Sequence, residues 1–237
     1  QEDLEFERFQ IKAVSAIEEE LDRILKTRKQ SRIQTIADMV IRNYGHLDEK
    51  INFYQNLRSL EDYVSRHSLN VAILCAMITH VMNIRREEQY HTVCAALLHD
   101  MGKLKKHEDV YFGAPYSRED AIRNCETQEE AYSVIEDAFA TEGPAIRRIC
   151  QQAAGKQLDL FPEEGKESRY KMLEGSNVLL VANRYDEITA MTLQGTAQSE
   201  VKAAQELLEH PEVYDPETVQ ALLRSINILP PGASVEL

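Results

Sequence analysis

The stretch ALLHDMGK, residues 96–103, places a histidine and an aspartate side by side at the end of an apolar run. A buried helix ordinarily ends in a cap and a turn, whereas this one ends in two side chains that are good metal ligands. Adjacent helical residues point about 100° apart, so His99 and Asp100 can share a metal ion only near a helix end, where Gly102 lets the backbone turn away. The pattern therefore indicates a metal site or the remnant of one.

The composition is that of a globular protein with a substantial core. The chain has 237 residues, 43% of them hydrophobic, which suits one large domain or two small ones. The formal net charge is −13 and no basic stripe interleaves with aromatic residues, so we expect no nucleic-acid partner. No apolar run approaches the roughly 18 to 20 residues of a membrane span, and the acidic start QEDLEFERFQ is unlike a signal peptide. We therefore expect a cytoplasmic protein without membrane contact.

The apolar periodicity is almost wholly helical and predicts an all-α fold. From Leu4 to about Leu60, apolar residues recur every three or four positions, which predicts an N-terminal segment of two or three helices. Further helices are predicted over residues 68–82, 86–99, 176–191 and 215–226, with a helix pair over 118–155. Residues 155–170 gather Gly, Pro and charge and are expected to form a long loop. The final residues, ILPPGASVEL, match the first strand of an unfinished hairpin, which indicates missing flanking domains.

The candidate metal ligands lie on three of these predicted helices. His67 begins the helix at residue 68, and His99 and Asp100 end the next one. The segment VANRYDEITA offers Asn183 and, one turn later on nearly the same face, Asp186. A single histidine at a helix start is more often a cap or a surface group. The prediction of a metal site therefore depends on the combination of His67 with His99 and Asp100. The histidines without such partners are assigned no chemistry: His46, His80, His91, His107 and His210.

Taken together, four segments resemble the HD superfamily of metal-dependent phosphohydrolases, in its HD-GYP branch. They are HSLNVA at residues 67–72, ALLHDMGK, VANRYDEIT at residues 181–189, and YDPETVQALL followed by ILPPGASVEL. The resemblance implies an all-helical HD domain over residues 51–237, preceded by an N-terminal helical segment over residues 1–50. HD-GYP members hydrolyse the bacterial second messenger cyclic di-GMP, so the resemblance also implies an ancestry in bacterial nucleotide signalling.

The resemblance assigns roles to individual residues. His67, His99 and Asp100 match the family's metal ligands, and Lys103 matches the lysine that steadies substrate phosphate or metal-bound water. Asp100 and Lys103 are therefore the implied catalytic residues. The family's last ligand aspartate falls on Asn183, which offers a neutral carbonyl oxygen instead of a carboxylate.

The chain also departs from the HD-GYP pattern. No histidine occurs between His107 and His210, so the mid-domain histidines and the Gly-Tyr-Pro signature are absent. The resemblance then implies at most one divalent ion, Mn, Fe, Ni or Zn, with one charged ligand fewer to support catalysis. Asp186 either supplies the missing carboxylate or, in a site that has lost its metal, pairs with a cation. Asn183→Asp is expected to raise metal affinity at little steric cost.

Two classes of function follow. The first is a mononuclear metal phosphohydrolase acting on a nucleotide or another phosphoester, with degraded activity towards cyclic di-GMP. Its ion would be held by His67, His99, Asp100 and either Asn183 or Asp186. The second is a catalytically inactive, metal-free HD domain that binds a nucleotide or a protein partner, or pairs with a second copy through its N-terminal helices.

The segment QLDLF, residues 157–161, resembles the pentapeptide with which many bacterial proteins dock on the replication sliding clamp. In that interpretation its leucine and phenylalanine would fill an apolar pocket on the partner. The alternative is a loop whose Leu158, Leu160 and Phe161 pack back onto the domain. We favour the alternative because nothing else in the sequence points to replication.

Overall fold

The computed structural model of the chain describes residues 2–29, 32–105, 116–165, 171–193 and 197–228. Within these ranges the fold is nine α-helices and one pair of two-residue strands, so the predicted all-α class is confirmed. The helices are α1 (Glu2–Thr27), α2 (Ile33–Tyr44), α3 (Tyr63–Val81), α4 (Arg86–Leu98), α5 (Arg118–Phe139), α6 (Gly143–Gln157), α7 (Glu174–Thr189), α8 (Glu200–Glu209) and α9 (Pro216–Ser225). Short 3₁₀ helices follow α4 (Met101–Lys105) and α6 (Leu158–Leu160), and the strands are β1 (Leu57–Arg58) and β2 (Met191–Thr192).

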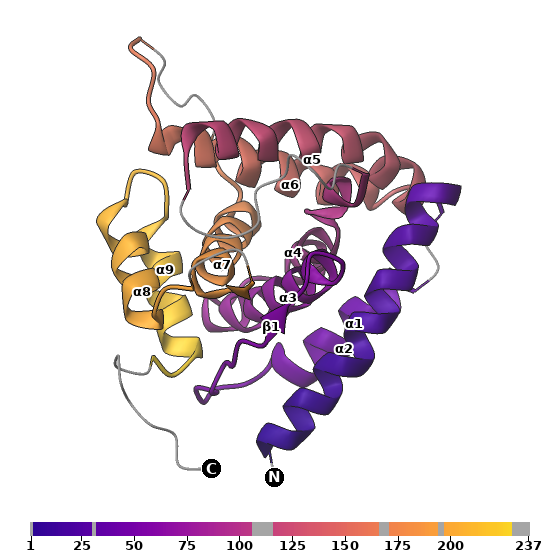
Figure 1. Cartoon of the computed structure of the whole chain (residues 1–237), viewed down its shortest axis with the longest axis horizontal. Helices are drawn as coiled ribbons and strands as arrows, with labels where there is room; N and C mark the ends of the chain where they lie inside the picture. The colour runs from indigo at the N-terminus through magenta and orange to yellow at the C-terminus, as the bar shows by residue number, and fades with distance from the viewer. Residues whose placement is uncertain (1, 30–31, 106–115, 166–170, 194–196, 229–237) are drawn as a thin grey trace.

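Helices α3, α4 and α7 form the centre of the molecule (Figure 1). Helix α3 packs against both of the others, and every side chain from Tyr63 to Thr79 except Arg66 is buried. Such burial on all sides is typical of a helix enclosed by its neighbours. Helices α5 and α6 lie side by side over one side of this centre, α8 and α9 lie on another, and α1 and α2 on a third.

The N-terminal helices share the core of the rest of the chain. Helix α1 packs against α3, and α2 packs against α3 and α4. Ile17, Leu21 and Ile24 of α1 are fully buried and belong to the same hydrophobic cluster as the central helices. The domain boundary near residue 50 stays a prediction, but these helices pack on the bundle and do not project from it.

The predicted start of the third helix was wrong by about one turn. Helix α3 begins at Tyr63, so His67 lies inside the helix and does not begin it. The reason is local: the Asp62 carboxylate accepts hydrogen bonds from the Ser59 backbone N–H and from Arg66, which completes the turn that precedes the helix. His67 is therefore held by helical backbone on both sides.

The N-terminal helical segment, predicted to run to about Leu60, ends at Tyr44, and β1 lies between it and α3. The remaining predicted helix ends differ by one or two residues. Helix α7 begins at Glu174, two residues before its predicted start, and Ser176 donates its hydroxyl to Gln152 of α6. Asp215, where the last helix was predicted to start, caps α9 and accepts from the Thr218 backbone N–H at 3.0 Å. Helix α8, capped by Ser199, was not predicted. The predicted hairpin strand at the end of the chain lies outside the described residues.

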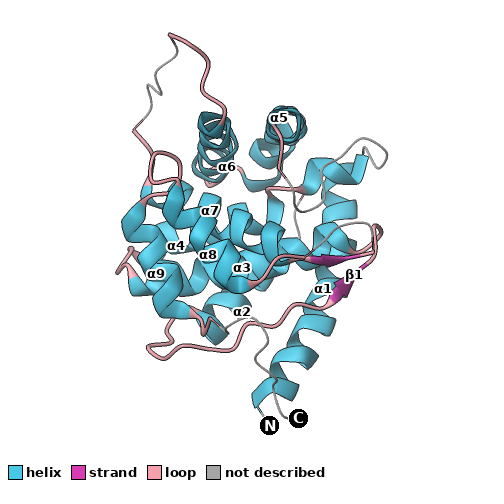
Figure 2. Ribbon diagram, turned by 60° about the vertical axis from the view of Figure 1, so that its left-hand side comes forward, coloured by secondary structure: helices cyan, strands magenta, loops and turns pink. Residues whose placement is uncertain are grey.

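The strand pair joins segments that are far apart in the sequence. β1 and β2 are parallel, with Leu57 opposite Met191 and Arg58 opposite Thr192, and Figure 2 shows them at one side of the bundle. This pairing ties the chain just before α3 to the end of α7. It therefore brings Arg58 next to the last turns of α7, where one of the candidate ligands lies.

The predicted long loop after residue 155 begins later than expected. Helix α6 continues to Gln157, and Leu158–Leu160 form a 3₁₀ turn. Leu160 packs against the core, and the Phe161 ring stacks on Tyr116 with a centroid distance of 6.2 Å. These contacts are those of a segment that packs back onto the domain, and docking on a sliding clamp stays a prediction.

No helix in the described ranges is long and apolar enough to cross a bilayer.

Candidate metal centre

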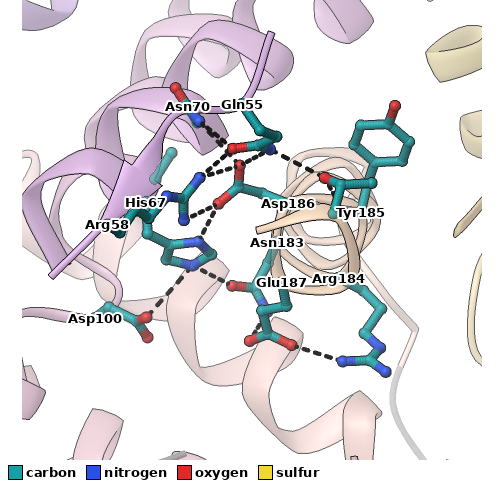
Figure 3. A network of polar contacts seen from close by, with 12 residues as sticks. Gln55, Arg58, His67, Asn70, Asp100, Asn183, Arg184, Tyr185, Asp186 and Glu187 are labelled. Carbon is teal, nitrogen blue, oxygen red and sulfur yellow. Dashed lines mark hydrogen bonds and ion pairs between the residues drawn. The ribbon is translucent and has the colours of Figure 1, made fainter. Parts of the chain in front are cut away.

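Side chains from α3, from the end of α4 and from α7 meet at one point. His67 Nε2 lies 3.1 Å from His99 Nε2 and 3.3 Å from Asp100 Oδ2. Asn183 Oδ1 lies 2.8 Å from His67 Nε2 and 2.9 Å from His99 Nε2. His67, His99 and Asp100 each offer one potential ligand atom, and these three atoms lie within 4.8 Å of one another. Four of the five predicted metal ligands thus converge, and Figure 3 shows the fifth, Asp186, on the opposite side of the His67 ring.

The backbone after α4 presents His99 and Asp100 together. Helix α4 ends at Leu98, and a 3₁₀ turn from Met101 to Lys105 redirects the chain. Gly102 was expected to let the backbone turn away. It does not use the backbone conformation special to glycine, because among the described glycines only Gly165 has a positive φ. A Cβ at Gly102 would lie 2.2 Å from the backbone oxygen of Thr127 in α5. Gly102 is therefore needed for the close approach of α5.

Gly102→Ala should for this reason push α5 away from the turn that carries Asp100 and Lys103. Because the obstructing atom is a backbone oxygen, we expect a loss of about 1–3 kcal/mol in the free energy of unfolding, as for other overpacked sites. Urea denaturation measures it, with Gly155→Ala as the control because a Cβ at Gly155 meets nothing within 4 Å. Equal stability of the two variants would contradict this role for Gly102.

The hydrogen bonds of the two histidines fix where their protons lie. His67 Nδ1 is 2.6 Å from Asp186 Oδ2, and His99 Nδ1 is 2.6 Å from the Ala96 carbonyl oxygen. Both partners only accept, so each Nδ1 carries a hydrogen, and in a neutral ring Nε2 then bears a lone pair. Burial lowers the pKa of His99, which favours its neutral form.

Asn183 adds a third acceptor, its Oδ1, because its amide nitrogen is held by Glu187, a contact that was not predicted from the sequence. Its Nδ2 donates to Glu187 Oε1 at 3.1 Å, and Glu187 is 1% exposed and also accepts from Arg184. A carboxylate only accepts, so the amide nitrogen faces Glu187 and Oδ1 faces the histidines. The i, i+4 spacing of Asn183 and Glu187 on α7 is the signal that could have revealed this pair.

When both rings are neutral, two imidazole lone pairs, an amide oxygen and the Asp100 carboxylate face one another. Burial raises the pKa of Asp100, but Lys103, His99 and His67 outweigh it and hold that pKa well below its usual value. Lys103 is 1% exposed, and its Nζ donates to Asp100 Oδ2 at 3.0 Å. Such a group of electron-rich atoms is stabilised by a cation, and this donor set suits a divalent transition metal.

Asp186 occupies a position behind His67. Arg58 donates to both of its oxygens at 2.8 Å, and Gln55 and Asn70 donate to Oδ1 at 2.7 and 3.0 Å. Burial raises the pKa of Asp186, but Arg58 and the hydrogen bond from His67 outweigh it, so the carboxyl stays ionised. Asp186 therefore pairs with a cation, which was the role predicted for a site that has lost its metal. The pair lies behind the His67 ring, however, so it leaves the converging ligand atoms in place. The contact of Asp186 with His67 Nδ1 also orients the ring, as carboxylates do for metal-binding histidines.

A small pocket opens beside the cluster. Its lining includes His99, Asp100 and Asn183 together with further residues of α5, α6 and α7. Its volume of about 30 Å³ has room for roughly two water molecules.

A family model for the HD domain matches residues 64–191, which is more than half of the chain. The chain belongs to the HD domain family. The matched span of this HD domain runs from the first turn of α3 to β2 and includes every residue of the cluster. HD domains form a superfamily of metal-dependent phosphohydrolases that usually bind divalent ions, and His67, His99 and Asp100 could hold one here. No curated protein and no solved structure matches the chain.

Proposed function

We propose that this HD domain is a mononuclear metal-dependent phosphohydrolase that acts on a small phosphoester. The observation that carries the proposal is the convergence of two imidazole nitrogens, one carboxylate and one amide oxygen with both histidine protons turned away. Three or four ligands of these kinds are what a catalytic site for Zn or a similar ion uses. In the described part of the chain this is the one group of three or more potential ligands, which favours a single ion.

The ion would act as a Lewis acid, polarising a phosphoryl oxygen and an attacking water. The protein side chains would prepare the site for it. Asp186 and the Ala96 carbonyl keep the Nδ1 protons in place, so both Nε2 atoms stay directed at the cluster. Lys103 places a fixed positive charge beside Asp100, where it would stabilise negative charge that develops on the phosphoryl oxygens.

The same proposal includes an HD-GYP ancestry in bacterial nucleotide signalling, supported by the sequence segments that resemble that branch. Turnover of cyclic di-GMP is not part of it, because the mid-domain histidines are missing. The second candidate is an inactive HD domain that binds a nucleotide or a protein partner. The neutral Asn183 at a ligand position favours that candidate.

Hydrolysis assays with added metal test the proposal. The purified protein, loaded with Mn²⁺ or Zn²⁺, should release nitrophenol from p-nitrophenyl phosphate or bis(p-nitrophenyl) phosphate, and a chelator should stop the reaction. Cyclic di-GMP should yield neither linear dinucleotide nor GMP. A protein that binds one ion per chain yet hydrolyses no phosphoester would support the inactive domain instead.

The contact between Asn183 and Glu187 changes the expected effect of Asn183→Asp. The new carboxylate would face Glu187 Oε1, which now lies 3.1 Å from the Asn183 amide nitrogen. We therefore expect the metal-free variant to lose on the order of 1–3 kcal/mol in unfolding free energy. The double variant Asn183→Asp/Glu187→Gln should lack this repulsion, and its new carboxylate should then raise the affinity for Mn²⁺.

Calorimetric titration with Mn²⁺ and thermal unfolding with and without metal measure both effects. Glu187→Gln alone serves as the control, because it removes one charge and leaves Asn183 in place. If Asn183→Asp alone is as stable as the wild type without metal, Glu187 does not constrain this position.

A further inference from the structure

The lining of the pocket beside the metal cluster carries three side-chain amides: Asn124 and Gln128 of α5, and Gln157 at the end of α6. Gln128 is 5% exposed and Gln157 is 4% exposed. The amide oxygen of each of the three is buried and has no hydrogen-bond partner among the described residues. Native proteins leave few buried polar atoms unpaired, so three around one small pocket need an explanation.

Local contacts hold two of these amides by their nitrogen atoms. Gln157 Nε2 donates to the Tyr214 hydroxyl at 2.9 Å, and Asn124 Nδ2 donates to the Tyr116 hydroxyl at 3.3 Å. Asn124 and Gln128 are four residues apart and therefore lie on one face of α5. The fold thus holds two of the three amides by their nitrogen atoms, and the oxygens of all three remain as acceptors.

The rest of the described lining shows which kind of group would fit. No lysine or arginine lines the pocket in the described part of the chain, so a phosphate inside it would meet no cationic side chain there. Apolar contacts come from Ala153, Leu179 and Leu180. A volume of about 30 Å³ accommodates a hydroxyl or an amine on a short chain.

We propose that Asn124, Gln128 and Gln157 form a subsite for hydrogen-bond donors on the alcohol part of the phosphoester. This inference rests on the proposed function, because the phosphate of the same molecule would lie at the metal cluster. His99, Asp100 and Asn183 border the same pocket, so a short hydroxyalkyl or aminoalkyl phosphate would contact both groups at once. The subsite selects esters that carry donors over plain alkyl esters, because an alkyl chain leaves the amide oxygens unpaired.

Calorimetric binding to the Mn²⁺-loaded protein tests the subsite without any need for turnover. The probes are glycerol 3-phosphate, which offers hydroxyls, O-phosphoethanolamine, which offers an amine, and propyl phosphate, which offers neither. We expect at least one donor-bearing ester to bind on the order of 10-fold more tightly than propyl phosphate. Which of the two binds more tightly identifies the donor.

Gln128→Met should remove this preference while it keeps the length of the side chain. The variant should unfold at the same temperature as the wild type or higher, because a buried unpaired oxygen is gone. Gln151→Met on the exposed face of α6 is the matched control and should keep the preference. Loss of preference without loss of stability is a result that a purely structural role for Gln128 would not give.

The outcomes separate the two proposals. Wild-type protein that binds all three esters equally overturns the subsite and leaves the proposed function standing. Preference that survives in Gln128→Met, or that is lost equally in Gln151→Met, also overturns the subsite. A protein that takes up no Mn²⁺ overturns both.

Discussion

Asp100→Asn is expected to abolish high-affinity metal binding and hydrolysis together. Asp100 is the only carboxylate among the four converging side chains, and its oxygens lie 3.3 Å from His67 Nε2 and 3.7 Å from His99 Nε2. The amide keeps the shape but removes the charge, so Mn²⁺ affinity should fall roughly 100-fold or more. Lys103 would also lose this buried counter-charge, so the metal-free variant should lose on the order of 3 kcal/mol.

Asp159→Asn gives a matched control for this substitution. Asp159 pairs with Lys156 at 2.8 Å with the same i, i+3 spacing as Asp100 and Lys103, but that pair is partly exposed and lies outside the cluster. Titration calorimetry and thermal unfolding should show near wild-type behaviour for the control. Wild-type metal affinity in Asp100→Asn would rule out the assignment of Asp100 as a ligand.

Arg58→Met should be the most destabilising single change at the site. The guanidinium of Arg58 is 1% exposed and donates to both oxygens of Asp186, which is fully buried. Removing one partner of a buried ion pair leaves the other charge uncompensated, which typically costs about 3–5 kcal/mol. Asp186 would keep its contacts with Gln55, Asn70 and His67, but no cationic side chain of comparable geometry replaces Arg58 in the described structure.

Urea denaturation of Arg58→Met and of Arg85→Met distinguishes this buried pair from an ordinary surface one. Arg85 pairs with Glu88 at 2.9 Å on the exposed start of α4, so its substitution should change stability little. If the two variants unfold at the same urea concentration, Arg58 does not have the stabilising role that its geometry indicates.

Much of this molecule could be predicted from the sequence because its helices are strongly periodic and its ligands lie in short motifs. The paired His99 and Asp100 at a helix end require only local geometry, and the structure brings them together with His67 and Asn183. The start of α3 was misplaced because the turn before it depends on Asp62 side-chain contacts, which leave no trace in apolar periodicity.

The parts that could not be predicted depend on contacts across long separations. Arg58 and Asp186 are 128 residues apart and meet because β1 pairs with β2, two strands too short to give a pattern of their own. The requirement for Gly102 comes from the Thr127 carbonyl of another helix. No local signal reports such contacts, so the setting of the metal ligands becomes visible only in the fold.

The metal content of the protein tests the central claim most directly. After reconstitution with Mn²⁺ or Zn²⁺ and dialysis, elemental analysis should find one ion per wild-type chain and none in His99→Ala, which lacks an imidazole of the cluster. A wild-type protein that retains no ion, or an ion that persists in His99→Ala, would contradict the account.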